Sequence, residues 1–295
     1  MAARYRVNHR TTYEYGATMT DGYSVTCLVP RDTQWQTVEA ASIALHPEAS
    51  EVDSSTDVFG NNVHQFGLHE PHDTMMVSAE SLVAVEERDD PVDDTPWEAV
   101  VEAGATSLGD PGAELGMFRS SSTLVEVDVL RRSLGPQIDD IFLPGRPIVD
   151  AARALCLHIH DSFEFDPHFS NVSTPLIDVL EARRGVCQDF AHVTLGCLRS
   201  VGLAARYVSG YIETAPPPGQ ERLVGADASH AWVSVWTPNA GWVDFDPTNG
   251  HLPVNDHVTV AWGRDYGDVI PVRGVMIGPA ASQQLHVAVD VDRLP

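Results

Sequence analysis

Residues 183–203 read Arg-Arg-Gly-Val-Cys-Gln-Asp-Phe-Ala-His-Val-Thr-Leu-Gly-Cys-Leu-Arg-Ser-Val-Gly-Leu. Small and apolar side chains recur in this stretch at three- and four-residue spacing, and Gly202 follows the last of them. The pattern predicts a helix that begins near Cys187, buries one face in a core and ends before Gly202. Free backbone N–H groups and the positive end of the helix dipole would then favour the thiolate form of Cys187 and could stabilise an oxyanion.

Cys187 has two interpretations, a nucleophile or a small buried hydrophobic residue. A nucleophilic thiol needs a base and a group that orients the base, so the rest of the chain must supply both. The other cysteines, Cys27, Cys156 and Cys197, form no CxxC or other tightly spaced pair. This spacing favours reduced thiols over a disulfide framework, and Cys197 is expected in the helix core.

Composition sets limits on the function. The 295 residues suffice for about two domains, and the hydrophobic fraction of 43% is typical of a globular core. Lys and Arg number 18 against 42 Asp and Glu, a formal net charge of −24, which makes nucleic acid and anionic membrane surfaces poor partners. We interpret the acidity as a solubility feature, with a preference for basic substrates as the alternative. With neither a signal-peptide pattern nor a long apolar run in the sequence, we expect a cytoplasmic protein.

The N-terminal part of the chain, residues 1–86, is predicted to be a β-sandwich. Residues 4–85 alternate between apolar and polar side chains in five or six short segments, and turn residues such as Gly60-Asn61-Asn62 separate them. Nucleophile, base and acid do not gather in this region. Its aromatic residues Tyr5, Tyr13 and Tyr15 are expected in the core.

The remaining chain is predicted to form an acidic linker and helical connection over 87–145, followed by a catalytic domain over 146–295. Helical periodicity covers residues 125–134 and 148–163, and a short helix follows Pro175. After Gly202 the period changes to two: residues 205–212 read as a strand, and residues 229–248 as a hairpin of two aromatic-rich strands. The sequence therefore predicts an α+β protein.

The hairpin carries the missing partners for Cys187. His230 opens its first strand and Asp246 closes its second, so antiparallel pairing brings the two side chains together. A carboxylate on one imidazole nitrogen would orient the ring and leave the other nitrogen for the thiol proton. Asp244 is a rival to Asp246 because residues two apart face the same side of a strand. His192, although nearer to Cys187 in sequence, is expected in the core or behind the site.

Four segments resemble one known family. They are Arg184-Gly-Val-Cys-Gln-Asp-Phe-Ala, Ala205-Arg-Tyr-Val-Ser-Gly-Tyr, Ser229-His-Ala-Trp-Val and Asp246-Pro-Thr-Asn. In this order they are similar to the bacterial transglutaminase-like cysteine hydrolases, and residues 4–15 resemble the β-domain that usually precedes that core. The resemblance implies a papain/transglutaminase-like core, with a central helix carrying the cysteine packed on an antiparallel sheet. It also implies the roles of nucleophile for Cys187, base for His230 and third member for Asp246, which it favours over Asp244.

The implied activity is hydrolysis of a peptide or protein amide through a thioester acyl-enzyme. Transfer of the acyl group to an amine, as in a transglutaminase, is the alternative. An inactive binding module on the same scaffold is a third hypothesis, against which the intact Cys, His and Asp set argues. The substrate and the oligomeric state stay open.

The neighbours of these residues have less specific roles. Gln188 is a candidate oxyanion donor, and Asp189 in the first turn could serve only the helix dipole. Trp232 and Trp242 are expected to be packing residues, with lining of a substrate groove as the alternative. Histidines such as His158 and His160 lack a compact ligand set, and there is no Gly-rich phosphate loop, so we predict neither a metal nor another cofactor.

Overall fold

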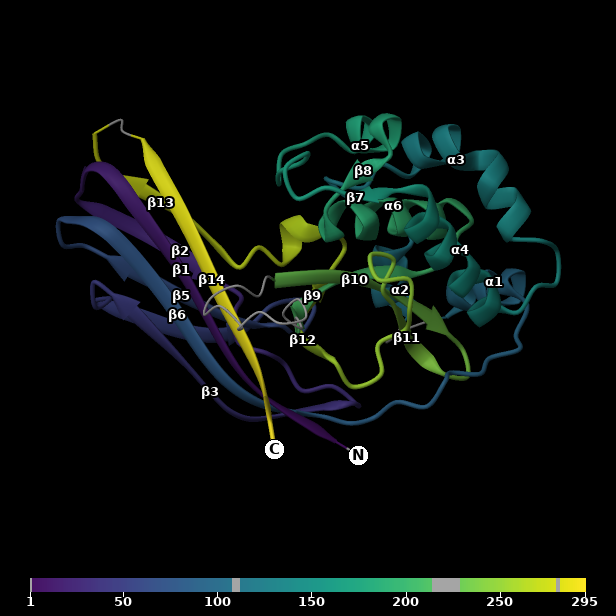
Figure 1. Cartoon of the computed structure of the whole chain (residues 1–295), viewed down its shortest axis with the longest axis horizontal. Coiled ribbons are helices and arrows are strands. Elements are labelled where there is room, and N and C mark those ends of the chain that lie inside the picture. The colour runs from purple at the N-terminus through teal and green to yellow at the C-terminus, as the bar shows by residue number, and fades with distance from the viewer. Residues whose placement is uncertain (1, 108–111, 214–228, 280–281) are drawn as a thin grey trace, which may run out of the picture.

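The computed structural model describes residues 2–107, 112–213, 229–279 and 282–295. A β-domain and a helix-rich domain lie side by side (Figure 1). The elements in chain order are β1 (Ala3–Met19), β2 (Asp21–Thr26), β3 (Gln36–His46), β4 (Glu51–Thr56), β5 (Asn62–Leu68), β6 (His72–Val85), α1 (Trp97–Thr106), α2 (Gly112–Phe118), α3 (Val127–Ile141), α4 (Ile148–Ser162), β7 (Glu164–Phe165), α5 (Leu176–Ala182), β8 (Arg184–Gly185), α6 (Cys187–Ser200), β9 (Ala205–Ile212), β10 (Ser229–Thr237), β11 (Gly241–Phe245), β12 (His257–Gly263), β13 (Val272–Ile277) and β14 (Gln283–Leu294).

The β-domain is a sandwich of two four-stranded antiparallel sheets, with strand orders β14-β1-β6-β3 and β13-β2-β5-β4. Its core lies between Phe66 and Leu68 of one sheet and Met75 and Val77 of the other. The predicted sandwich is therefore present. The sequence did not indicate β4, since all six of its residues are exposed and it has no apolar alternation.

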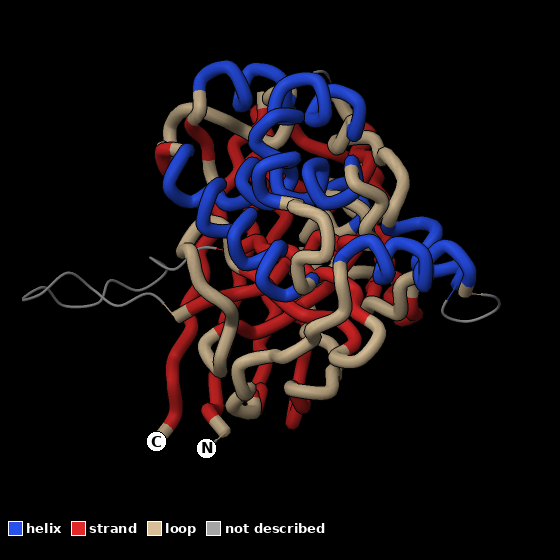
Figure 2. The backbone as a smooth tube through the Cα atoms, turned by 90° about the vertical axis from the view of Figure 1, so that its right-hand side faces the viewer, coloured by secondary structure: helices blue, strands red, loops and turns tan. Residues whose placement is uncertain are grey.

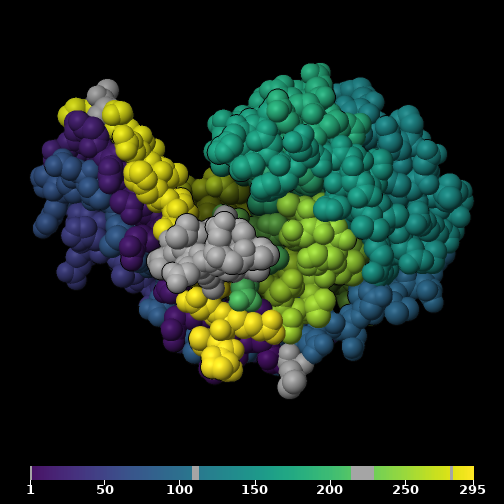
Figure 3. Space-filling view, in the orientation of Figure 1, coloured from purple at the N-terminus to yellow at the C-terminus, as the bar shows by residue number. Residues whose placement is uncertain are grey.

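The last strands of the chain correct the predicted domain boundaries. β14 pairs with β1 from Arg4↔Leu294 to Tyr15↔Gln283, and β13 pairs with β2. Residues 272–294 thus complete the sandwich, whereas the sequence assigned all of 146–295 to the catalytic domain. In the space-filling view β14 (yellow) lies along the N-terminal strands (purple), across a notch from the teal helices (Figure 3).

The segment predicted as a connection, 87–145, is also different in the structure. Its helix α3 buries Leu130, Leu134 and Ile138 against the catalytic core. A Cβ on Gly196 of α6 would lie 2.4 Å from Leu130, so glycine is what lets the two helices approach this closely. This segment is therefore an integral part of the second domain.

The second domain is built around α6, which packs against the antiparallel sheet β11-β10-β9-β12. Every residue of α6 from Asp189 to Arg199 is buried, so the helix is enclosed by its neighbours, although the sequence predicted only one buried face. The helix ends at Ser200, and Gly202 follows with a φ of 90°, as its position predicted. In Figure 2 the helices gather in the upper part of the view and both termini lie at its lower end.

The helices of the described ranges include none that is both long and apolar enough to cross a bilayer.

Candidate active site

Cys187 is held at the first turn of α6 by the side chain of Asp189. The Asp189 carboxylate accepts the backbone N–H of Val186 at 2.8 Å and the hydroxyl of Ser170. A Cβ on Gly185 would lie 2.5 Å from Asp189 Oδ2, so this close approach requires glycine. Burial raises the pKa of Asp189, while these hydrogen bonds oppose the rise. Asp189 thus fixes the start of the helix, in agreement with its expected service to the helix terminus.

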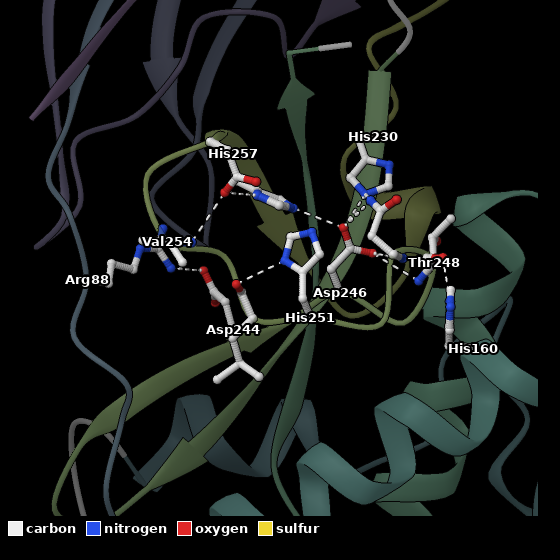
Figure 4. Close-up of polar contacts among 12 residues, drawn as sticks. Arg88, His160, His230, Asp244, Asp246, Thr248, His251, Val254 and His257 are labelled. Atoms are coloured by element: carbon white, nitrogen blue, oxygen red, sulfur yellow. Dashed lines mark hydrogen bonds and ion pairs between the residues drawn. The ribbon is translucent and has the colours of Figure 1, made fainter. Parts of the chain in front are cut away.

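His230 and Asp246 lie in hydrogen-bond contact, although 15 residues separate them in sequence. Asp246 Oδ2 lies 2.7 Å from His230 Nε2, as Figure 4 shows. Burial alone would lower the pKa of His230, but its interactions with Asp246 and Cys187 outweigh it and raise the pKa to about 10. The three side chains thus follow one another in a line from Cys187 through His230 to Asp246, with a hydrogen bond between the last two.

The carboxylate of Asp246 is fully buried and receives donors on both oxygens. Oδ1 accepts the backbone N–H groups of Thr248 at 2.9 Å and Asn249 at 3.1 Å. Oδ2 accepts His257 Nε2 at 3.0 Å and Asn249 Nδ2 at 2.7 Å, in addition to His230. Burial would raise the pKa of Asp246, but the hydrogen bonds from the two histidines hold it well below its usual range. The group is therefore a fixed, ionised acceptor.

Asp244, the rival third member, belongs to a different cluster. Its Oδ2 lies 2.7 Å from Arg88 Nη1, and its side chain also interacts with Arg206. Burial would raise the pKa of Asp244, but the charges of the two arginines keep it below its usual value. β11 ends at Phe245, so the strand alternation that would place both carboxylates together stops before Asp246, and the two side chains diverge (Figure 4).

The two candidate groove tryptophans lie in different places. Trp232 has no exposed surface, so the structure corrects the alternative that it lines a groove. Its ring stacks on His230 at a centroid distance of 6.1 Å and meets the ring of His257 edge-on at 5.0 Å. It lies against β9 where a Cβ on Gly210 would be 2.5 Å from the indole, so Trp232 supports both imidazoles from behind.

Trp242 lies farther along the same sheet, stacked on the guanidinium of Arg206, and its side chain is half-buried. It lines a cavity of about 390 Å³ together with Arg88, Asp244 and Trp262. Gln188 is half-buried in the first turn of α6.

His192 and the remaining cysteines are part of the core. His192 accepts the backbone N–H of Tyr266 at 3.2 Å, and burial lowers its pKa to about 4. All four cysteines are free thiols. Burial raises the pKa of Cys27, Cys156 and Cys197 to about 12 each, whereas Cys187 is half-buried. The accessible thiol is therefore the one at the helix start.

Sequence reasoning missed His257, Asp256 and Asn249. His257 opens β12, which pairs with β9 and so comes to lie beside Asp246. The only signal was an Asp-His pair at the head of an apolar run. Asn249 stood in the recognised Asp-Pro-Thr-Asn segment, but its contact with Asp246 could not be read from the sequence.

His230, Asp246 and His257 also offer ligand atoms within 4.8 Å of one another, the spacing of a metal site. Two tetrahedral ligands at about 2.1 Å from one zinc ion lie about 3.4 Å apart. The separations from Asp246 Oδ2 to the two imidazoles, 2.7 and 3.0 Å, are shorter and are those of hydrogen bonds. The arrangement fits shared protons better than a shared cation.

Comparison with known proteins places this site in a family context. Residues 5–84 match the family described as the bacterial transglutaminase-like N-terminal region, and residues 139–247, which include Cys187, His230 and Asp246, match the transglutaminase-like superfamily. An uncharacterized protein of Mycobacterium tuberculosis (strain ATCC 25618 / H37Rv) is 38% identical over 98% of this chain and 92% of its own length. An uncharacterized protein of Mycobacterium leprae (strain TN) is 32% identical over 99% of both chains.

Two further similarities concern proteins whose names state an activity. The crystal structure of a "Putative Cysteine Protease" from Cytophaga hutchinsonii has a TM-score of 0.75 at 20% identity, and the alignment covers all of this chain and 92% of that one, which shows a common fold. A protein-glutamine gamma-glutamyltransferase of Pseudomonas aeruginosa is 38% identical over 71 residues, 24% of this chain and 11% of that protein. The chain belongs to the transglutaminase-like superfamily and carries the bacterial transglutaminase-like N-terminal region.

Proposed function

We propose that this protein is a cysteine-dependent amide hydrolase in which Cys187 is the nucleophile, His230 the base and Asp246 the group that orients the base. One observation carries the proposal: the buried imidazole of His230 is hydrogen-bonded to Asp246 and interacts with Cys187, whose thiol lies at a helix start. Acyl transfer by a thiol needs these three functions in this order.

The chemistry follows from the positions of the donors. The thiolate of Cys187 attacks the carbonyl carbon of the amide, and the C=O π electrons move to the oxygen. His230, as imidazolium, then gives its proton to the leaving nitrogen, so the C–N bond breaks and a thioester remains on Cys187. Water, deprotonated by His230, attacks the thioester and releases the carboxylic acid and the thiol. Asp246 keeps the imidazole in the required tautomer throughout.

The oxyanion is stabilised by the start of α6. The backbone N–H groups of Asp189 and Phe190 are both taken by the carbonyl of Val186. Within the described ranges no acceptor is found for the backbone N–H groups of Cys187 and Gln188. These two donors are the candidates for the oxyanion hole, which gives Gln188 a role through its backbone instead of its side chain.

Hydrolysis is the first choice because nothing in the chain marks a calcium loop or a site for an acceptor amine. Transfer to an amine is the second candidate, and the similarity of about a quarter of this chain to a protein-glutamine gamma-glutamyltransferase favours it specifically. The two reactions share every step up to the thioester and differ only in what resolves it. The substrate that we expect in either case is a peptide or protein amide.

A peptide library analysed by mass tests both reactions. Incubation without an added amine should give shortened or deamidated peptides, whereas incubation with a primary amine should add that amine's mass only if the enzyme is a transferase. Cys187→Ala is the matched control and should abolish turnover, while Cys197→Ala removes a buried thiol away from the reaction. Unchanged product formation by Cys187→Ala would refute the proposed mechanism.

A further inference from the structure

The carboxylate of Asp246 holds two imidazoles, of which the proposed reaction uses one. His257 reaches the oxygen that His230 also contacts, at 3.0 Å, and its other nitrogen, Nδ1, lies 2.8 Å from Asp256 Oδ1 (Figure 4). The side chain of His257 has no exposed surface. A carboxylate accepts hydrogen bonds and does not donate them, so a carboxylate on each nitrogen means that each nitrogen carries a proton. The geometry is that of an imidazolium.

The surroundings of His257 agree with a positive charge. The titratable groups that face it are Asp246 after β11, Asp256 beside it on its own segment, His230 on β10 and His251 in the preceding loop. The two carboxylates are its anionic neighbours and contact it directly, whereas the imidazolium of His230 lies at a ring-centroid distance of 5.7 Å. Burial would lower the pKa of His257, but its hydrogen bonds to Asp246 and Asp256 raise the pKa instead.

A buried cation at this place matters for the reactive state of the site. When Cys187 is a thiolate and His230 an imidazolium, the line Cys187, His230 and Asp246 carries one net negative charge in a poorly solvated region. The positive charge of His257 brings the net charge of these buried groups to zero. The negative charge of Asp256, which also contacts His257, lies on a partly exposed side chain, where water screens it. Charge interactions in the interior are screened less than in water, so this balance favours the thiolate.

We propose that His257, held by Asp256, is a positioning residue that supplies the positive charge needed to keep Cys187 a thiolate near neutral pH. It acts through Asp246 and touches neither substrate nor the reacting atoms. The inference rests on the proposed function in that it takes Cys187 and His230 as the reactive pair. It can be tested without any substrate.

The test is the rate at which iodoacetamide alkylates Cys187 as a function of pH, followed by mass in the full-length protein. His257→Gln keeps a hydrogen-bond donor for Asp246 but removes the charge. Loss of a cation disfavours a nearby anion, so the midpoint of the alkylation profile should rise by about one pH unit. His251→Gln is the matched control, since the ring of this exposed histidine lies close to that of His257, while its contact with Asp246 is a backbone hydrogen bond that the substitution keeps, and its profile should coincide with that of the wild type. Coincidence of the His257→Gln and wild-type profiles would overturn the proposal.

A second measurement covers the case in which His257→Gln does not fold. Nitrogen NMR of the wild-type protein labelled in its histidines should show His257 with both ring nitrogens protonated at pH 7.5. The signal is assigned as the one that shifts in Asp256→Asn, a substitution at a partly exposed side chain. A neutral His257 at that pH would refute the charge balance. Absence of peptide turnover, by contrast, would count against the proposed hydrolase and leave both of these readouts intact.

Discussion

Asp244 lies in β11 and Asp246 directly after it, and the first is nearly buried and the second fully buried, yet they have different kinds of partner. Asp244 faces arginine side chains, and Asp246 faces imidazoles. A guanidinium keeps its proton at any physiological pH, whereas an imidazole exchanges one near neutrality. The comparison separates a carboxylate that stabilises the fold from one that orients a group able to transfer protons.

The largest contrast is expected in activity. Asp246→Asn removes the carboxylate that orients His230, and we expect kcat to fall by about 10²–10⁴-fold. Asp244→Asn leaves the line from Cys187 to Asp246 intact, so kcat should stay within about threefold of the wild type among molecules that are folded. Steady-state kinetics on a peptide found in the library screen measure both. A larger loss of kcat in Asp244→Asn would reverse the assignment of the third member.

The effect of Asp244→Asn is instead expected in stability. Asp244→Asn leaves the nearly buried guanidinium of Arg88 without its counter-charge, and the loss in the free energy of unfolding should approach the value of about 3 kcal/mol that breaking a buried pair costs. Urea unfolding measures the loss. Glu39→Gln is the control: it removes the partner of Arg4 in an exposed ion pair and should change the free energy of unfolding by no measurable amount. Equal effects of the two substitutions would show that the arginine cluster does not stabilise the fold.

The pH dependence of stability should separate the two clusters further. The pKa of His230 is raised in the folded protein to about 10, so the folded state retains a proton that the unfolded state releases above pH 6.5. The contribution of His230 is therefore complete below pH 6.5 and is lost as the pH rises toward 10, by at most about 1.4 kcal/mol per pH unit.

The measurement is the difference in free energy of unfolding between wild type and His230→Gln at pH 6 and pH 8.5, which should shrink. The corresponding difference for Asp244→Asn should stay nearly constant over that interval, because neither its carboxylate nor the arginines titrate there. A constant difference for His230→Gln would mean that the hydrogen bond to Asp246 does not raise the pKa of the imidazole.

How far the sequence predicted this site depends on how local the signal was. The helix at Cys187 and the strands within 205–212 and 229–245 each have a clear periodicity in the sequence. Because a short antiparallel hairpin places the start of its first strand beside the end of its second, the proximity of His230 and Asp246 could be predicted. The β-sandwich followed from alternation in the same way. The preference for Asp246 over Asp244 as the third member, however, came from the family resemblance, because their spacing alone placed both side chains on one face of the strand.

The features that the sequence did not reveal depend on long-range pairing. β14 pairs with β1, which lies at the other end of the sequence, and no pattern within residues 283–294 indicates which strand they pair with. His257 reaches Asp246 only because β12 pairs with β9, outside the hairpin. Lining of a groove was one alternative for Trp232, but the indole is buried because Gly210 has no side chain and leaves room for it. This tertiary contact could not be predicted from the sequence.

The central claim is that the thiol of Cys187, and no other thiol, is activated by His230 and Asp246. Iodoacetamide labelling of the native protein at pH 7, followed by peptide mapping, tests it most directly. We expect Cys187 to be modified at least tenfold faster than Cys27, Cys156 and Cys197, whose burial and raised pKa keep them as inert thiols. Modification of Cys187 no faster than that of the three buried thiols would contradict the account.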